Sequence, residues 1–238
     1  MRKCLVGIVV VVACLTVLVP GLAKADTTYV ANAFVSYVGP GLSPYVTLNT
    51  NKPESNVLAG PYKLNVNGVN SLWDCTAGST NLVSPWYAYE TNLAGAITAF
   101  DAYYDPILLV SHSMDAKLNE VAWLADQVNI PANQNAKTQA LYNEAIWYVM
   151  DGTNIADNTT DSAGNTPDEV KALANSYAGQ TPGGYETFLI PLTNVVNGYG
   201  TFNPNNQPMV TTPEPGAFLV FGSALGWLGF ALRRRLNS

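Results

Sequence analysis

Alternating hydrophobic and polar positions mark the first half of the chain as strand-forming. Residues 28–38 are largely aromatic, β-branched or small and predict a strand, which ends at Gly39-Pro40-Gly41. Two further alternating segments, 62–66 and 69–73, flank Asn67-Gly68. This dipeptide is preferred in type I′ hairpin turns because both of its residues tolerate positive φ. We therefore expect a hairpin over 62–73, with further strands at 86–91 and 185–192.

A two-residue turn fixes the register of this hairpin. Because side chains alternate across a strand, the pairing places six side chains on one, mostly apolar, face: Tyr62, Leu64, Val66, Val69, Ser71 and Trp73. Cys75 falls on the same face by the same period of two. The hairpin pattern therefore predicts that the Cys75 side chain faces a core.

The spacing of apolar residues becomes helical in the middle of the chain. Ser113 can cap a helix over 114–128, and a second helix is predicted over 136–150. Thr166-Pro167-Asp168-Glu169 combines a capping box with proline at the first helical position, and Gly179 ends the helix that follows. The chain therefore predicts about three helices.

Strands and helices together predict one α+β domain over residues 26–196, with β-hairpins and about three helices. Residues 197–212 are rich in Asn, Pro, Gly and Thr and carry no charge. Their composition predicts a flexible spacer between the domain and the C-terminal segment.

The first 25 residues have the three parts of a secretory signal peptide. Met1-Arg2-Lys3 is followed by an apolar run and then by Ala23-Lys24-Ala25, so cleavage after Ala25 would leave Asp26 first. A lipoprotein signal at Cys14 and an uncleaved anchor are the alternatives. The apolar run continues past Cys14 and is shorter than the ~20 residues of a membrane span, which favours the cleaved signal peptide.

The C-terminal segment, residues 213–236, also has three parts in a fixed order. Pro213-Glu214-Pro215 precedes residues 216–232, which carry no charge, and Arg233, Arg234 and Arg235 follow. A helix over 216–232 would rise about 25 Å, slightly less than a ~30 Å hydrocarbon core, and terminal arginines can snorkel to the interface. The basic end would stay cytoplasmic, which leaves the domain outside.

Charge narrows the classes of partner. Residues 26–212 contain 16 acidic and five basic side chains, a net charge of −11, whereas the whole chain carries −6. Such a charge argues against nucleic acid and against anionic membrane surfaces. Cys75 is the one cysteine that remains after signal cleavage, so the mature domain cannot form an internal disulfide.

The residues that could carry chemistry do not predict an enzyme. His112 is the single histidine, no Gly-x-Ser-x-Gly sequence is present, and no acid is placed to orient that histidine. A histidine-based zinc site would need more ligands than one His and one Cys. The loop 151–169 offers several Asp and Asn oxygens for Ca²⁺, but it lacks the order of an EF-hand loop, so we predict no metal cofactor.

The three-part tail closely resembles the PEP-CTERM sorting signal of Gram-negative bacteria, on Pro213, Glu214, Pro215, the uncharged span and Arg233 to Arg235. The resemblance implies that an exosortase, a membrane protease-transpeptidase, recognises the tail and cuts near Pro-Glu-Pro. It also implies export through the inner membrane, delivery to the cell surface or extracellular matrix, and an association with exopolysaccharide and biofilm. A plain tail anchor that is never cut is the alternative interpretation.

The exported domain is similar to domains of other PEP-CTERM proteins and distantly resembles thioester adhesin domains. A cysteine follows an early hairpin, and Asn143-Glu144-Ala145-Ile146-Trp147 occupies the place of their Gln-x-Ala-Ile-Trp helix. The resemblance implies an internal thioester between Cys75 and this position. Here the carboxamide belongs to the shorter Asn143, and the nearest glutamine is Gln139, one helical turn earlier. Cys75 as a small buried hydrophobe is the favoured interpretation.

Overall fold

A computed structural model of the chain describes residues 27–41, 44, 46–48, 57–76, 82–104, 114–128, 130–151, 160–177 and 180–211. The predicted signal peptide and the predicted sorting signal lie outside these residues, as does His112. Within the described ranges, no helix has both the length and the apolar character needed to cross a bilayer.

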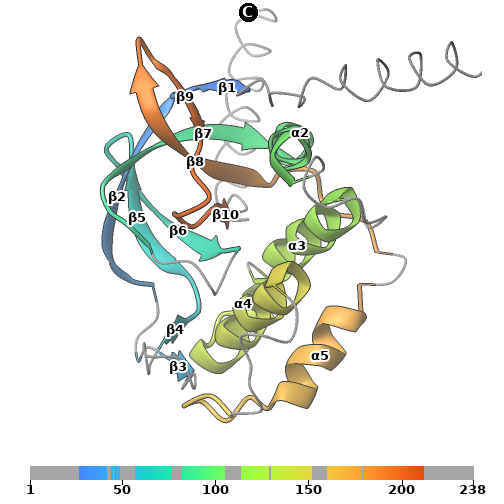
Figure 1. The fold of residues 1–238 in the computed structure, drawn as a ribbon. Coiled ribbons are helices and arrows are strands. Elements are labelled where there is room, and N and C mark those ends of the chain that lie inside the picture. The colour runs from blue at the N-terminus through green and yellow to red at the C-terminus, as the bar shows by residue number, and fades with distance from the viewer. Residues whose placement is uncertain are drawn as a thin grey trace, which may run out of the picture.

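An antiparallel sheet that closes into a ring of six strands forms one side of the domain (Figure 1). Each strand pairs with the next around the ring, and β7 pairs back to the first strand, β2. In ring order, the strands are β2 (Ala33–Pro40), β5 (Tyr62–Val66), β6 (Val69–Cys75), β10 (Met209–Thr211), β8 (Thr187–Val196) and β7 (Trp86–Asn92).

Among the described residues, four short strands lie outside this ring. The far half of β8 pairs with β9 (Tyr199–Phe202), and β9 pairs with β1 (Thr28–Val30). A separate two-stranded sheet consists of β3 (Val46–Leu48) and β4 (Val57–Ala59). The single strand predicted over 28–38 is thus divided into β1 and β2. The reason lies between them, where the Asn32 side chain bonds both the N–H and the carbonyl of Glu90 on β7.

The predicted hairpin is confirmed as β5–β6, in the predicted register. Tyr62 lies opposite Trp73 and Val66 lies opposite Val69. Asn67 and Gly68 both have positive φ, at 50° and 89°, as the type I′ turn requires. The Cys75 side chain is completely buried on the inner face.

Four α-helices within the described residues pack against the ring, where the sequence predicts about three. They are α2 (Leu93–Tyr104), α3 (Met114–Val128), α4 (Ala136–Asp151) and α5 (Pro167–Asn175), with a 3₁₀ turn at Pro131–Asn133. The helix α2 was not predicted because its sequence is almost entirely apolar or small and lacks a polar stripe. The predicted capping box of α5 is confirmed: Thr166 Oγ1 accepts from Glu169 N–H, and Glu169 Oε2 accepts from Thr166 N–H at 2.7 Å.

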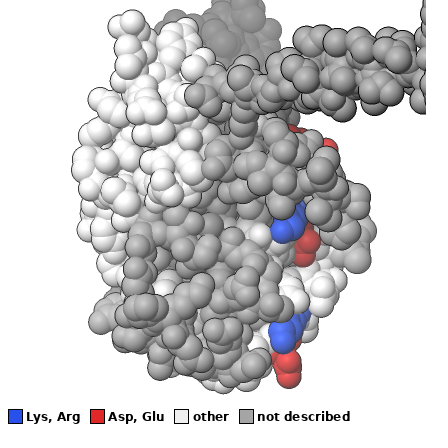
Figure 2. All heavy atoms as spheres, viewed as in Figure 1, with Lys and Arg blue, Asp and Glu red and all other residues white. Residues whose placement is uncertain are grey.

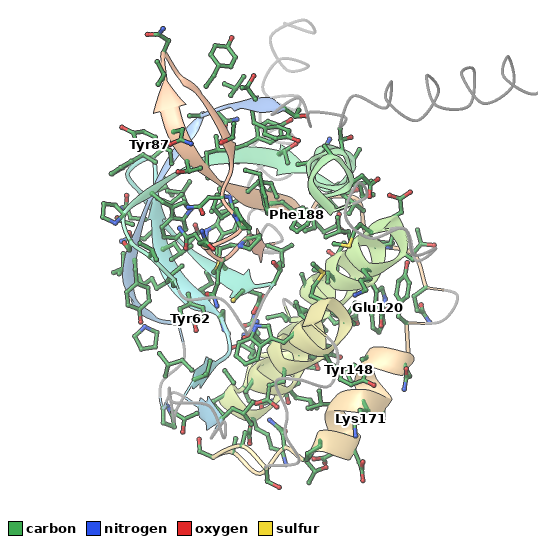
Figure 3. The ribbon with its side chains drawn as sticks, viewed as in Figure 1. Tyr62, Tyr87, Glu120, Tyr148, Lys171 and Phe188 are labelled. Carbon is green, nitrogen blue, oxygen red and sulfur yellow. The ribbon has the colours of Figure 1, made fainter. Side chains whose placement is uncertain are left out.

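Two hydrophobic cores lie on opposite faces of the sheet. Inside the ring, Val35, Leu64 and Cys75 pack together, and Trp147 of α4 joins them. On the outer face of β8, Phe188 and Ile190 pack against the helices, and Figure 3 shows Phe188 between the sheet and the helical layer. The helix α4 contributes to both cores, and its residues 143–147 are all buried.

The prediction of a flexible spacer over residues 197–212 is wrong. Asn197 and Gly198 form a turn with positive φ at both residues, and the chain then returns as β9. The strand β10 follows and fills the position between β6 and β8. The domain therefore extends to Thr211. Apolar positions in this stretch are few, but Phe202, Met209 and Val210 reach cores that other segments build.

Side-chain and backbone hydrogen bonds secure β10 at both of its ends. Before the strand, the Pro208 carbonyl accepts from both the N–H and the hydroxyl of Thr76, each at 3.0 Å. At its end, the Thr211 hydroxyl donates to the Leu72 carbonyl at 2.7 Å. The last described strand is therefore an integral part of the closed sheet.

Candidate functional site

The end of β6 meets the buried middle of α4 at Cys75. The Cys75 carbonyl accepts two hydrogen bonds from α4, one from Trp147 Nε1 at 2.9 Å and one from Asn143 Nδ2 at 3.2 Å. On the β5 side, burial raises the pKa of the Tyr62 phenol above its ordinary value, and the nearby Cys75 and Tyr37 add to that effect. Figure 3 marks Tyr62 on the inner side of β5.

Asn143 uses both ends of its carboxamide for backbone hydrogen bonds. While Nδ2 donates to Cys75, Oδ1 accepts from the Gly60 N–H at 3.0 Å. Gly60 has φ of 116°, a conformation that favours glycine, so the amide holds a tight turn just before β5. The structure thus brings Cys75 and Asn143 together. Gln139 lies one turn earlier on α4 and is partly buried.

A buried carboxyl pair lies next to Asn143 on α4. Glu144 is 4% exposed and contacts Asp161, which is 5% exposed and precedes α5. Burial, together with the charge of Asp161 and the hydrogen bond to it, raises the pKa of Glu144 to about 9. The raised pKa favours the protonated form of Glu144 at neutral pH, in which its carboxyl can share a proton with Asp161.

Asp161 is already surrounded by donors from its own loop. Its Oδ1 accepts from the N–H groups of Ala163 and Asn165 at 2.8 Å, and its Oδ2 accepts from Asn165 Nδ2 at 2.7 Å. Two of the loop residues considered for calcium therefore hydrogen-bond each other. In the described part of the chain, no group of three or more His, Cys, Asp or Glu side chains is arranged to hold a metal ion.

A second carboxyl pair links α3 to the segment before β8. Asp126 Oδ2 accepts from the Gly183 N–H at 2.5 Å, and Glu186 Oε1 accepts from the Gly184 N–H at 3.0 Å. Glu186 is 2% exposed and lies within hydrogen-bond reach of Asp126. Burial raises the pKa of Asp126 to about 7, and the hydrogen bond and charge of Glu186 contribute to this rise.

Asp74 is a third buried acid, without a second carboxyl beside it. It pairs with Val210 across β6 and β10, so strand alternation directs its side chain toward the face that the helices cover. Burial raises its pKa to about 7, and among the described residues its Oδ1 has no hydrogen-bond partner. Burial therefore favours the neutral form of this acid at pH values where an exposed aspartate is charged.

Sequence reasoning missed all three of these acid sites. The partners in the two pairs are 17 and 60 residues apart in the chain, and nothing in the local pattern shows that either will be buried. The sequence contains one signal for Asp74. It lies between Trp73 and Cys75, two residues expected to face inward, so its side chain must lie on the opposite face at the end of the strand. The predicted sorting residues Pro213–Pro215 and 233–235, and the cleavage-site residues Ala23 and Ala25, lie outside the described residues.

The surface over the sheet differs from the surface over the helices. On the face shown in Figure 2, the described Lys, Asp and Glu side chains lie along one side of the molecule, and the described sheet side carries none. Phe34 and Tyr87 are adjacent on β2 and β7, about half exposed, with ring centroids 5.3 Å apart. Figure 3 places Tyr87 on the outside of the sheet.

Comparison of the chain with family models, with curated proteins and with solved structures gives no match in any of the three.

Proposed function

We propose that this chain is an exported, non-enzymatic cell-surface or matrix protein that an exosortase sorts through its C-terminal segment. The observation that carries the proposal is the order of the tail, Pro213-Glu214-Pro215, an uncharged span and three arginines. The position of the tail supports it, since β10 ends at Thr211, two residues before the motif. A cut near the motif would release a domain whose described strands are all present.

The C-terminal mass of the mature protein tests the sorting step. In a strain with a working exosortase, the mature protein should lack Arg233–Arg235. A variant with Pro213, Glu214 and Pro215 all changed to alanine should keep the tail and stay in the membrane fraction. Thr212→Ala is the matched control and should be processed normally. Wild-type protein with Arg235 still attached in that strain would contradict the proposal.

We further propose that the exposed aromatic face of the sheet binds a neutral extracellular polysaccharide. Exposed apolar side chains gather there, including Phe34, Val38 and Tyr87, while the domain as a whole is strongly acidic. This surface is mainly aromatic and apolar, with exposed Lys63 of β5 opposite Gly39 near its edge. It suits a neutral partner, because sugar rings pack on aromatic faces and the strongly acidic domain would repel an anionic polymer.

Retention on isolated matrix polysaccharide tests this surface. The double variant F34A/Y87A should lose retention at least about tenfold, a loss of roughly 1.4 kcal/mol. The control I130A removes an exposed apolar side chain away from this sheet face and should be retained like the wild type. Equal retention of F34A/Y87A and wild type would remove this face from the proposal.

A covalent adhesin is the second candidate. The observation in its favour is that Asn143 lies next to Cys75, although its Nδ2 bonds the Cys75 backbone carbonyl and not the thiol. In that reaction the Cys75 thiolate would attack the side-chain carbonyl carbon of Asn143 or Gln139. A C–S bond would form, the C–N bond would break, and ammonia would leave with the thiol proton. The intact mass would then be one ammonia low, and an amine would open the thioester. Full mass, with a thiol that reacts after denaturation, would eliminate this candidate; Cys75→Ala is the control.

A further inference from the structure

The segment that carries α5 is attached to the helical layer at both of its ends. We call residues 160–177 and 180–186 the α5 segment. In Figure 1, α5 lies at the edge of the molecule, beside α4. The helix has nine residues and buries Val170 and Ala174. A helix this short depends on tertiary contacts for its stability, so the attachments at its two ends decide whether it stays in place.

The two attachments have the same chemistry. At the beginning of the segment, Asp161 contacts Glu144 of α4, and at its end Glu186 contacts Asp126 of α3. Two carboxyl groups can hydrogen-bond only when one of them carries a proton. Without that proton, two negative charges repel each other at short range. Both carboxyls of the first pair are buried, whereas in the second pair Glu186 is buried and Asp126 is partly exposed. Each end of the segment therefore includes one contact that needs an exchangeable hydrogen. At the beginning of the segment, bonds between Ser162 and Thr47 and from Asn165 to the Lys137 carbonyl add attachments that do not depend on pH.

The lysine described near the Glu144–Asp161 pair interacts with other groups. Lys137 of α4 donates from Nζ to the Gly164 carbonyl at 3.4 Å and acts on the exposed Glu169 of α5. The other charged side chains of α5 are Asp168 and Lys171, and Figure 3 labels Lys171 on that helix. Within the described residues, Asp161 is the one charged group that acts on Glu144.

The surroundings of the second pair are also acidic. On α3, Glu120 lies near Lys117, whose Nζ donates to the Met150 carbonyl at 3.0 Å. Tyr177, just after α5, lies near Glu120 and packs against Trp123, with ring centroids 6.0 Å apart. Among the described groups, the Gly183 N–H and Glu186 act on Asp126, and neither is a cation. Because no described cation acts on either pair, a bound proton is what removes one of the two negative charges in each pair.

We propose that the α5 segment is a proton-dependent latch, held on α3 and α4 by the pairs Glu144–Asp161 and Asp126–Glu186 and released as pH rises. Release would uncover the apolar surface of α4 against which α5 packs with Val170 and Ala174. This inference is independent of how the protein is sorted.

The direction of the pH effect follows from proton binding. The attached state holds protons that the detached state releases, because a carboxyl in water has a pKa near 4. The stabilisation is complete below that pKa and is lost as pH rises toward the pKa in the attached state. Each bound proton that is released changes the opening constant about tenfold per pH unit. We expect about a hundredfold per unit from pH 5 to 7, and about tenfold per unit from pH 7 to 9, where Glu144 alone still holds its proton.

Amide hydrogen exchange on the full domain tests the latch in the wild type, where no variant has to fold. Exchange rates, corrected for the intrinsic effect of pH, give an opening constant for residues 160–177 and for the β5–β6 hairpin. The opening constant of the α5 segment should rise with pH much more steeply than that of the hairpin. No pH dependence, or parallel behaviour of segment and hairpin, would overturn the proposal.

Matched variants then assign the effect to the pairs. Asp126→Asn and Glu144→Gln replace the shared proton by a permanent amide hydrogen, so each should remove about a tenfold-per-unit slope and the double variant should show almost none. Asp168→Asn, an exposed carboxyl of α5, should leave the wild-type slope. An unchanged slope in the double variant would contradict the proposal. If Ca²⁺ alone restored protection at high pH, the pairs would be cation sites and not proton latches.

Discussion

A single carboxamide, that of Asn143, connects three parts of the domain that are distant in the chain. It joins α4 to the turn before β5 and to the end of β6 through the Gly60 N–H and the Cys75 carbonyl. A carboxamide can donate and accept at once, which neither a carboxylate nor an apolar side chain can do. This dual use explains an asparagine at a fully buried position without requiring any covalent chemistry.

Replacing Asn143 by leucine should destabilise the domain by about 3 kcal/mol, because two buried backbone groups each lose a partner. Urea unfolding at neutral pH measures the change. Asn119→Ala is the control, since Asn119 makes an exposed side-chain bond to its own helix and should cost less than about 1 kcal/mol. Equal costs for the two variants would mean that the Asn143 bonds contribute nothing beyond a surface bond.

Asp74 should make the stability of the sheet fall as pH rises. Its pKa is raised from 3.8 to about 7 by burial, so the folded state binds a proton that the unfolded state releases in that window. The stabilisation of the folded state linked to the proton on Asp74 is complete below pH 4 and is lost as pH approaches 7. Asp74→Asn stays neutral and should be more stable than the wild type at pH 8, with little difference at pH 4.

Thermal unfolding of wild type and Asp74→Asn across this pH range isolates the effect, because the contributions of the other acids cancel in the difference. Asp115→Asn, on the exposed side of α3, is the control. It should change the pH dependence of unfolding neither in the wild type nor in Asp74→Asn. A difference between wild type and Asp74→Asn that does not change with pH would show that the acid is not neutral in the folded state.

At the scale of single elements, the local sequence predicts the helices and strands that contain a turn or capping motif of their own. The hairpin β5–β6 has its Asn-Gly turn and α5 has its capping box, so both were predicted with their boundaries nearly correct. The same Asn-Gly signal at 197–198 was available for β8–β9 and was outweighed by the polar composition around it. Helix α2 and strand β10 have no such signal, because partners distant in the chain create them.

The end of β2 illustrates how two neighbouring glycines differ in the structure. A Cβ built on Gly41 would lie 2.5 Å from the Pro61 carbonyl oxygen, while one on Gly39 would meet nothing within 4 Å. Gly41→Ala should therefore destabilise the domain by about 1–3 kcal/mol, and Gly39→Ala should change it by less than about 0.5 kcal/mol. Chemical denaturation of both variants checks this, and equal stabilities would contradict the close approach of β2 and the turn before β5.

On the scale of the whole molecule, ring closure is what the sequence could not show. The strand β10 pairs with β6, more than 130 residues earlier, and its three residues resemble any short apolar stretch. The buried acids were missed for the same reason, since burial arises only when α3, α4 and the ring are assembled. Local patterns predicted the α+β class and most elements, whereas the cores and the acid sites depend on the assembled fold.

A pair of truncations tests the role of β10. The domain ending at Thr211 should unfold cooperatively, because every strand of the ring is present. The domain ending at Gln207 lacks β10 and should lose cooperative unfolding, since Met209 and Val210 leave both cores and two strand edges lose their partner. Circular dichroism during heating distinguishes them. Similar melting curves would mean that residues 208–211 are dispensable.

The position of β10 also dictates when the domain can form. A ribosome makes this strand last, so every incomplete chain has a sheet with a gap between β6 and β8. The gap closes only after residue 211 has been added and is free to pair. Until then the edges of β6 and β8 that β10 covers stay unpaired. The complete sheet therefore cannot form before the last residues of the domain are available to pair.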